Sequence, residues 1–260
     1  MKIADAHTHI FPEKIAVKAT KSIGDFYESD MFADAAVSKL IESENSIGTE
    51  KYLVCSSAVT AEQVTSINNF ISNECKRHPC FLGLAALHPD TFNYEEELDR
   101  AVELGLKGVK FHPDFQRFNM DDDKAIPMYR AIARRNLPVL FHMGDDRYDF
   151  SAPKRLINIC RQVPDLIAIG AHFGGYRRWD EAYSMPKNDN IFYDTSSSLA
   201  FLDKDKALRM IERFGADHFM FGSDFPMWNP KKELERFLAL GLDDKQNEDI
   251  LYNNFNRLFK

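Results

Sequence analysis

Short apolar runs that resemble buried β-strands recur along the chain at nearly regular intervals. From the second run onward their starting residues lie about 25 to 30 positions apart, and most gaps hold a segment with the periodicity of an amphipathic helix. Apolar strands that alternate with helices are typical of a parallel sheet buried on both faces, and eight such units predict a parallel α/β barrel. The eight runs are IADAHTHIF from Ile3, KYLVCSS from Lys51, FLGLAALHP from Phe81, GVKFHP from Gly108, PVLFHMG from Pro138, LIAIGAHFGG from Leu166, IFYDTSS from Ile191 and FMFGSDFP from Phe219.

The chain length fits one barrel. The sequence has 260 residues, and a (βα)8 TIM-type barrel typically needs about 250. No Ser- or Pro-rich linker divides it, so residues 1–260 are predicted to form a single domain. The one irregular gap follows the first strand, where residues 11–33 form an insertion before a helix-like segment at 34–45. Two interpretations stay open for it: a flap over the barrel mouth, or a surface excursion without a role.

The composition limits the classes of partner and the compartment. A net charge of −7 and a pI near 5.6 argue against nucleic acid, because phosphate contacts need clustered Lys and Arg. The N-terminus has no apolar run ahead of a cleavage site, and no stretch of about 18 apolar residues occurs, so we expect no membrane association and a cytoplasmic protein. The four cysteines form no Cys-x-x-Cys pair, which indicates buried or idle thiols.

The first strand carries three ionisable side chains at alternate positions. Successive side chains of a strand point to opposite faces, so Asp5, His7 and His9 share one face and the two imidazoles lie roughly 6 to 7 Å apart. One metal ion could contact both imidazoles. For a His-x-His pair taken alone, two solvated or hydrogen-bonded histidines are an equally good interpretation.

Further polar residues stand where the later strands end. In a parallel barrel the catalytic groups lie at the carboxyl ends of the strands, and there three imidazoles and one carboxylate would form a first shell for a divalent ion such as zinc, with a position left for water. The sequence therefore predicts a metal-dependent site at this rim. Its candidate residues are His7, His9, Lys110, His112, His142, His172 and Asp224.

Five motifs at these strand ends occur in a characteristic order: DAHTH, GVKFHP, VLFHMG, AHFGG and FGSDFP. With them the chain resembles the amidohydrolase superfamily over nearly its whole length, in particular the amidohydrolase-related branch that contains aminocarboxymuconate-semialdehyde decarboxylase. The resemblance implies that the metal ligands are His7, His9, His142 and Asp224. It also places His172 at the catalytic histidine and implies a homodimer.

The number of ions and the substrate contacts are less determined. In two-metal members of the superfamily a lysine at the position of Lys110 is carboxylated and bridges the ions, whereas the branch resembled here generally uses one. We expect one Zn²⁺, with Mn²⁺, Co²⁺ or Fe²⁺ as alternatives, and Lys110 and His112 as substrate contacts. His112 could instead be hydrogen-bonded within the rim. Arg147, Arg177 and Arg178 lie in loops after strands, where a guanidinium could bind the carboxylate of a small anionic substrate or simply be solvated.

The reaction has several candidates. A bound divalent ion acidifies water and polarises a carbonyl, with Asp224 and His172 handling protons, which suits hydrolysis of an amide, lactone or ester of a small organic acid derivative. The same site could perform non-oxidative decarboxylation of an unsaturated or aromatic carboxylic acid. A metal-dependent nuclease is a third candidate, although those relatives generally carry a glutamate where this chain has VKFHP. A barrel that only stores or senses metal is the non-enzymatic alternative, and it would be expected to lack a ligand or base.

Overall fold

The computed structural model describes residues 1–259. The chain divides into two compact units. Unit 1 comprises residues 1–55 together with the chain from Thr195 onward, and unit 2 comprises residues 56–194.

The strands of unit 1 centre on β1 (Ile3–His9), which pairs in parallel with β2 (Thr49–Cys55). The segment that follows β9 (Phe219–Met220) runs along β1 as well. The amide of Ala6 donates to the Phe221 carbonyl and the amide of His9 to the Phe225 carbonyl, both at 2.8 Å. β1 therefore has a chain neighbour on both edges, which explains why nearly all of its side chains are buried.

Three helices of unit 1 begin at residues whose side chains cap the helix N-terminus. Asp203, Asn229 and Asp243 each accept a hydrogen bond from a backbone amide of the first turn that follows, which satisfies donors that have no partner within a helix. The helix-like segment at 34–45 contains a helix, as predicted, and so does the 11–33 insertion. The helices are α1 (Glu13–Tyr27), α2 (Val37–Asn45), α9 (Lys204–Phe214), α10 (Pro230–Leu238), α11 (Asp244–Glu248) and α12 (Asn254–Leu258), with a π-helical segment at Asp249–Asn253.

Unit 2 holds a continuous series of parallel strands. Each neighbouring pair from β4 to β8 is parallel, with registers such as Val109 opposite Val139 and Val139 opposite Ala168. The run from Phe81 was expected to be one strand, but it forms two short pieces separated by the buried Leu84. The strands are β3 (Phe81–Gly83), β4 (Ala85–Ala86), β5 (Val109–Phe111), β6 (Val139–Phe141), β7 (Ala168–Gly170) and β8 (Ile191–Asp194).

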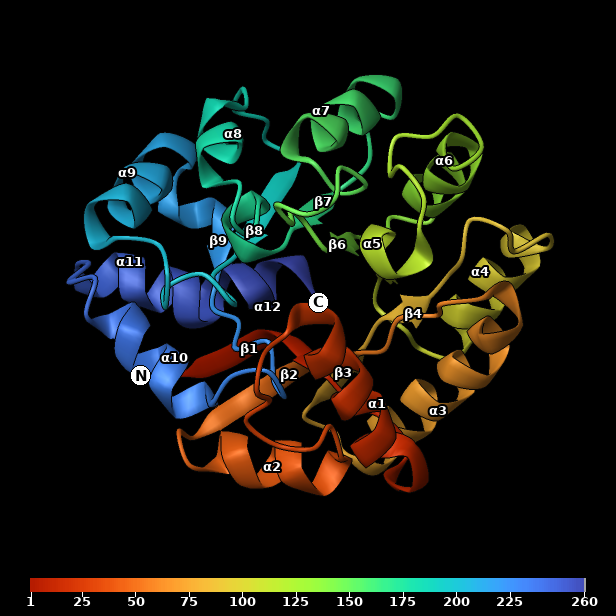
Figure 1. Ribbon diagram of the computed structural model, residues 1–260, viewed down its shortest axis with the longest axis horizontal. Coiled ribbons are helices and arrows are strands. Elements are labelled where there is room, and N and C mark those ends of the chain that lie inside the picture. Colours follow the sequence, from red (N-terminus) through yellow and green to blue (C-terminus); the bar gives the residue numbers. More distant parts are fainter. Residues whose placement is uncertain (260) are drawn as a thin grey trace. The chain divides into compact units, whose positions relative to one another are not determined.

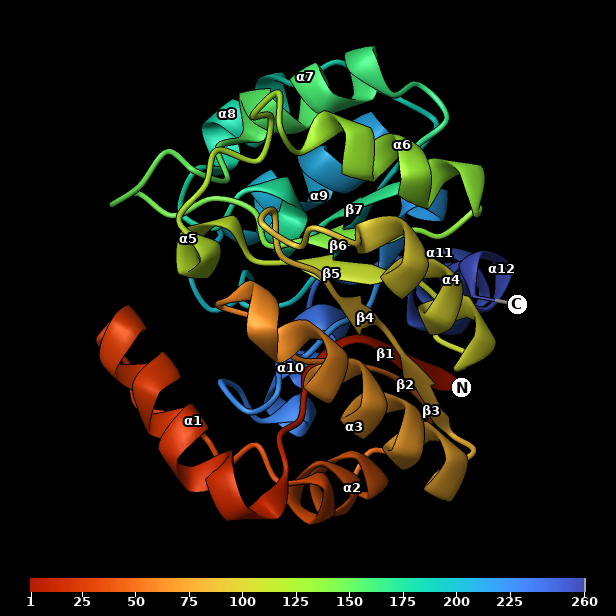
Figure 2. The ribbon, with the colours of Figure 1, turned by 90° about the vertical axis from the view of Figure 1, so that its right-hand side faces the viewer.

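Helices follow the strands of unit 2 in the alternation that the sequence predicts. Figure 1 shows α3, α4, α6 and α7 on one side of these strands, and Figure 2 shows α6 and α7 beside β5, β6 and β7. Their bounds are α3 (Val64–Arg77), α4 (Tyr94–Glu103), α5 (Pro113–Gln116), α6 (Ile126–Arg134), α7 (Pro153–Gln162) and α8 (Trp179–Ser184). None of the helices in the described part of the chain is long and apolar enough to span a membrane.

A buried asparagine joins three elements of unit 2. The Asn68 side chain on α3 accepts from the Ala86 amide at 2.7 Å and donates to the Ala86 carbonyl at 3.2 Å and to Glu97 Oε1 at 2.6 Å. The short strand β4 thus obtains side-chain partners for both polar backbone groups of Ala86, which fix it against α3 and α4.

Replacing this asparagine is expected to destabilise the protein. Asn68→Ala leaves buried partners without hydrogen bonds, and such groups cost about 1 to 3 kcal/mol each. We expect the free energy of unfolding to fall by about 2 to 4 kcal/mol in denaturant titrations. The matched control is Asn69→Ala. Asn69 is exposed, and its side chain accepts a hydrogen bond from the Arg100 side chain at the protein surface. Equal effects of the two substitutions would contradict this account.

Candidate metal centre and active site

Two imidazoles and one carboxylate converge in unit 1. Nε2 of His7 lies 3.6 Å and Nε2 of His9 lies 3.3 Å from Oδ1 of Asp224. Their ligand atoms all lie within 4.8 Å of one another. Asp224 reaches this position because its amide donates to the His7 carbonyl at 2.8 Å, and because its backbone adopts a left-handed conformation with φ of 59°. The strand-end signal in the sequence therefore identified three side chains that the fold brings together.

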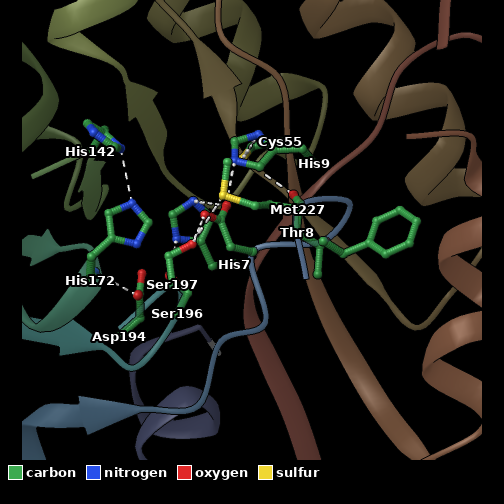
Figure 3. Close-up of polar contacts among 12 residues, drawn as sticks. His7, Thr8, His9, Cys55, His142, His172, Asp194, Ser196, Ser197 and Met227 are labelled. Atoms are coloured by element: carbon green, nitrogen blue, oxygen red, sulfur yellow. Dashed lines mark hydrogen bonds and ion pairs between the residues drawn. The ribbon is translucent and has the colours of Figure 1, made fainter. Parts of the chain in front are cut away.

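Hydrogen bonds on the far side of each imidazole determine which nitrogen faces Asp224. Nδ1 of His7 lies 3.0 Å from the Ser196 hydroxyl, and Nδ1 of His9 lies 3.6 Å from Sγ of Cys55, which itself donates to the Thr8 carbonyl (Figure 3). In the neutral form with its proton on Nδ1, each ring would present the Nε2 lone pair toward Asp224. Histidines that bind metals generally have their other nitrogen anchored in this way. The donor set of unit 1 therefore fits a divalent cation.

Three buried carboxyl groups lie in the same unit, and burial favours their protonated forms. Burial raises the pKa of Asp5 to about 6, although hydrogen bonds from Glu44, Ser223 and the His7 amide oppose the rise. Burial and repulsion from Asp5 raise the pKa of Glu44 well above its usual value. Burial likewise raises the pKa of Glu233 to about 7, with Arg236 opposing and the charges of Asp224 and Asp5 contributing. A cation nearby would favour the ionised forms of these groups and so lower their pKa values.

The pKa of His9 depends on burial and on two neighbouring side chains. Burial disfavours its imidazolium form, but Cys55 and Asp224 outweigh burial and raise the pKa of His9 to about 9. Because a metal binds the neutral imidazole, a cation at Nε2 must displace a proton from His9 near neutral pH.

Three of the predicted histidines lie together in unit 2. Nε2 of His172 and Nδ1 of His142 are 3.0 Å apart, as the dashed line in Figure 3 marks, and the two rings are arranged edge to face. His172 has φ of 61°, and its amide donates to Oδ1 of Asp194 at 2.9 Å. The indole of Trp179 donates to its carbonyl at 3.0 Å. These backbone contacts hold His172 in a conformation that a non-glycine residue rarely adopts.

His112 is stacked between two rings in unit 2. The Phe115 ring lies 3.6 Å and the His142 ring 4.0 Å from it, between ring centroids. Nδ1 of His112 accepts from the Phe115 amide at 3.3 Å, so the neutral ring carries its proton on Nε2. Although His112, Asp114 and His142 offer ligand atoms within 4.8 Å, this tautomer makes His112 a hydrogen-bond donor and a poor metal ligand.

Asp114 is a buried residue of unit 2 that the sequence did not single out. One of its oxygens accepts from the Ser151 hydroxyl at 2.5 Å. Burial raises the pKa of Asp114 to about 7, with Ser151 opposing and Asp145 adding to the rise.

The predicted substrate-binding cations differ in their surroundings. Lys110 on β5 is almost fully buried. Arg147 forms a bidentate pair with the buried Asp145, and Arg178 pairs with Glu181 and Asp149. Arg177 is exposed and lies over the Tyr176 ring. In this structure two of the three arginines are thus engaged by carboxylates of the same unit.

Several residues that support the site were missed by the sequence analysis. Cys55 is buried as expected, but it contacts His9 and is not idle. Ser196 and Ser197 also stand directly after a strand, so the same strand-end rule could have identified them. Asp114 also follows β5 closely, so the same rule could have identified it, whereas Glu233 lies within α10, where no such signal exists. The role of His142 as a fourth ligand stays a prediction.

Solved structures that resemble the chain define its class. An uncharacterised TIM-barrel protein from Bordetella bronchiseptica is 18% identical with a TM-score of 0.78, covering 99% of this chain and 98% of that one. The chain is therefore an α/β protein with the TIM-barrel fold, as the spacing of its strands predicted. The family model described as Amidohydrolase matches residues 4–260, and the chain belongs to this family of enzymes.

Two further structures come from proteins with different reactions. A protein proposed to be a 2-pyrone-4,6-dicarboxylic acid hydrolase from Pseudomonas putida is 16% identical with a TM-score of 0.72, covering 99% of this chain and 97% of that one. A dihydroxybenzoic acid decarboxylase from Polaromonas with bound manganese and 2-nitroresorcinol is 16% identical with a TM-score of 0.76. The match covers 99% of this chain and 96% of that one. None of the curated proteins with which the sequence was compared matches it.

The raised pKa of Glu233 predicts a dependence of stability on pH. Its pKa is about 7 in the folded chain against an ordinary value of 4.5, so ionisation increasingly destabilises the folded state as pH rises through this window. Glu233→Gln cannot ionise, and its melting temperature relative to wild type should therefore rise between pH 5 and pH 8. Thermal unfolding in the presence of a chelator measures this. The exposed Glu235→Gln is the control, and a pH-independent difference for Glu233→Gln would refute the prediction.

Proposed function

We propose that the protein is a metal-dependent hydrolase that cleaves an amide, lactone or ester bond of a small organic acid derivative. The observation that carries the proposal is the arrangement of His7 and His9, whose Nε2 atoms face Oδ1 of Asp224. His142 is proposed as the fourth ligand of one Zn²⁺, on the basis of the family resemblance. The same donors also suit Mn²⁺, Co²⁺ or Fe²⁺.

The cation would supply Lewis acidity, which polarises a carbonyl oxygen and makes a water molecule more acidic. The protein's own groups then handle protons. Asp224 can accept a proton from water and pass it to the leaving group, because its carboxylate lies beside the ligand nitrogens. His172 is held by its backbone contacts and can stabilise negative charge that develops on the substrate.

Binding of the substrate's acidic group is assigned to unit 2. The Nε2 proton of His112 and the ammonium of the buried Lys110 are donors of the kind that bind a carboxylate. Arg177, whose side chain is exposed and lies over the Tyr176 ring, is the arginine we favour for this role. An anionic substrate also agrees with the predicted cations in the loops after the strands.

Decarboxylation is the second candidate, and one observation favours it. A decarboxylase that binds manganese and an aromatic inhibitor has the same fold over nearly the whole chain. In that reaction carbon dioxide leaves and a proton from His172 or Asp224 replaces it, without addition of water to a carbonyl.

Isotope labelling separates the two reactions. A panel of lactones, amides and aromatic carboxylic acids is incubated with the metal-loaded protein in ¹⁸O-labelled water, and carbon dioxide release is monitored in parallel. Hydrolysis predicts incorporation of ¹⁸O into the product of a lactone or amide. Release of carbon dioxide without ¹⁸O incorporation would instead support the decarboxylase.

Removing the histidine of unit 2 tests its role in either reaction. His172→Asn should retain metal while kcat falls by about 10² to 10⁴, the usual contribution of general acid–base catalysis. His78→Asn is the control in the same unit, since His78 lies beside Glu74 and Phe81, away from the predicted rim. Normal turnover of His172→Asn would remove this residue from the mechanism.

A further inference from the structure

The second carboxylate oxygen of Asp224 has partners of its own in unit 1. While Oδ1 faces His7 and His9, Oδ2 accepts a hydrogen bond from the Ser197 hydroxyl. The oxygen of this hydroxyl accepts in turn from the indole Nε1 of Trp228 at 2.9 Å. Ser197 is buried, and Trp228 is half-buried. A chain of two hydrogen bonds therefore ends on the side of Asp224 that faces away from the imidazoles.

The chemistry of the groups determines the direction of donation in these two hydrogen bonds. An indole N–H can only donate, so Ser197 must act as the acceptor for Trp228. The hydroxyl has a single proton, and two acceptors compete for it: Oδ2 of Asp224 and the thioether of Met227, whose sulfur lies 3.7 Å away (Figure 3). The carboxylate is much the stronger acceptor. Trp228 thus orients the hydroxyl, and the hydroxyl orients the carboxylate.

Backbone conformation supports the same arrangement. Ser197 has φ of 50° and Asp224 has φ of 59°, and left-handed conformations of this kind are unfavourable for residues with a Cβ. Strained residues persist where the surroundings determine them, and they concentrate at functional sites. Here both strained residues direct their side chains at each other.

We infer that Ser197 and Trp228 are positioning residues which hold Asp224 to a divalent cation through Oδ1 alone. The inference rests on the proposed role of Asp224 as a metal ligand. Ser197 occupies Oδ2 and prevents the carboxylate from rotating into a two-oxygen contact, and Trp228 acts only through Ser197. Neither residue touches the reacting atoms.

A purely structural role is the alternative for Trp228. Its ring lies edge-on to the Phe201 ring at 5.7 Å and beneath the Arg236 guanidinium at 5.2 Å. Phenylalanine at this position keeps an aromatic ring and removes the N–H together with part of the indole, so the loss of packing is measured separately in the Ser197→Ala background. Ser197→Ala similarly keeps the Cβ, so the cost of the left-handed backbone is unchanged while the hydroxyl is lost.

A double-mutant cycle read out by metal affinity tests the inference. Wild type, Ser197→Ala, Trp228→Phe and the double variant are stripped with a chelator and titrated with Zn²⁺ by calorimetry. We expect Ser197→Ala to bind Zn²⁺ about 10 to 100 times more weakly, as is usual when an outer partner of a ligand is lost. Trp228→Phe should weaken binding by about threefold or more in the wild-type background and have no further effect after Ser197→Ala, because coupled residues are not additive.

Two controls separate positioning from general destabilisation. Ser198→Ala removes a neighbouring buried hydroxyl that donates to the Ser196 carbonyl and has no bond to Asp224, and it should bind Zn²⁺ with the affinity of wild type. All variants are checked by circular dichroism for the wild-type fold. Substitution with Co²⁺ adds a spectroscopic readout: release of Oδ2 in Ser197→Ala should change the visible absorption of the bound cobalt, which loss of packing alone would leave unaltered.

The experiment distinguishes a failure of the positioning role from a failure of the proposed metal centre. Wild-type affinity in Ser197→Ala, or equal effects of Trp228→Phe in both backgrounds, overturns the positioning role while leaving the proposed hydrolase intact. Absence of Zn²⁺ and Co²⁺ binding to the wild-type protein itself overturns the metal centre, and with it both the proposed function and this inference.

Discussion

The burial of ionisable side chains on β1 is the constraint that organises unit 1. Asp5 and His7 are almost completely removed from water, because β1 has a chain neighbour on both edges. Buried polar groups are costly unless they are hydrogen-bonded. Asp5 accepts from the amides of His7 and Ser223, and the imidazoles are anchored by Ser196 and Cys55. Each of these contacts leaves the Nε2 atoms directed at Asp224, where a cation would complete the balance of charge.

Much of the fold follows from patterns that the sequence displays directly. Short apolar runs at regular spacing gave the strands, and amphipathic segments between them gave helices such as α3, α4, α6 and α9. The barrel was predictable because burial of a parallel sheet on both faces leaves few alternatives for eight strand–helix units. His7, His9 and Asp224 were predictable for a related reason: the carboxyl ends of parallel strands meet at one edge, so polar residues there gather whatever their separation in the chain.

The remainder depends on contacts that no periodicity encodes. Trp228 lies after the strand end, and only the fold shows that its indole points at Ser197. The carboxylates that pair with Arg147 and Arg178 could not be inferred from loop composition, because a loop guanidinium has many partners within reach. The split of the run from Phe81 into β3 and β4 depends on local backbone geometry at Leu84. Neither the sequence pattern nor the fold determines the reaction, because hydrolysis and decarboxylation use the same metal-ligating side chains.

The central claim is that a cation binds unit 1 through imidazole Nε2 atoms and the Asp224 carboxylate, with the Cys55 thiol behind His9 and outside the coordination sphere. X-ray absorption spectroscopy of the zinc-loaded protein tests it most directly. The account predicts a first shell of nitrogen and oxygen only, at about 2.0 to 2.1 Å, with the multiple scattering of imidazole rings. A sulfur scatterer at about 2.3 Å would instead make Cys55 a ligand, and it would contradict the arrangement described for His9.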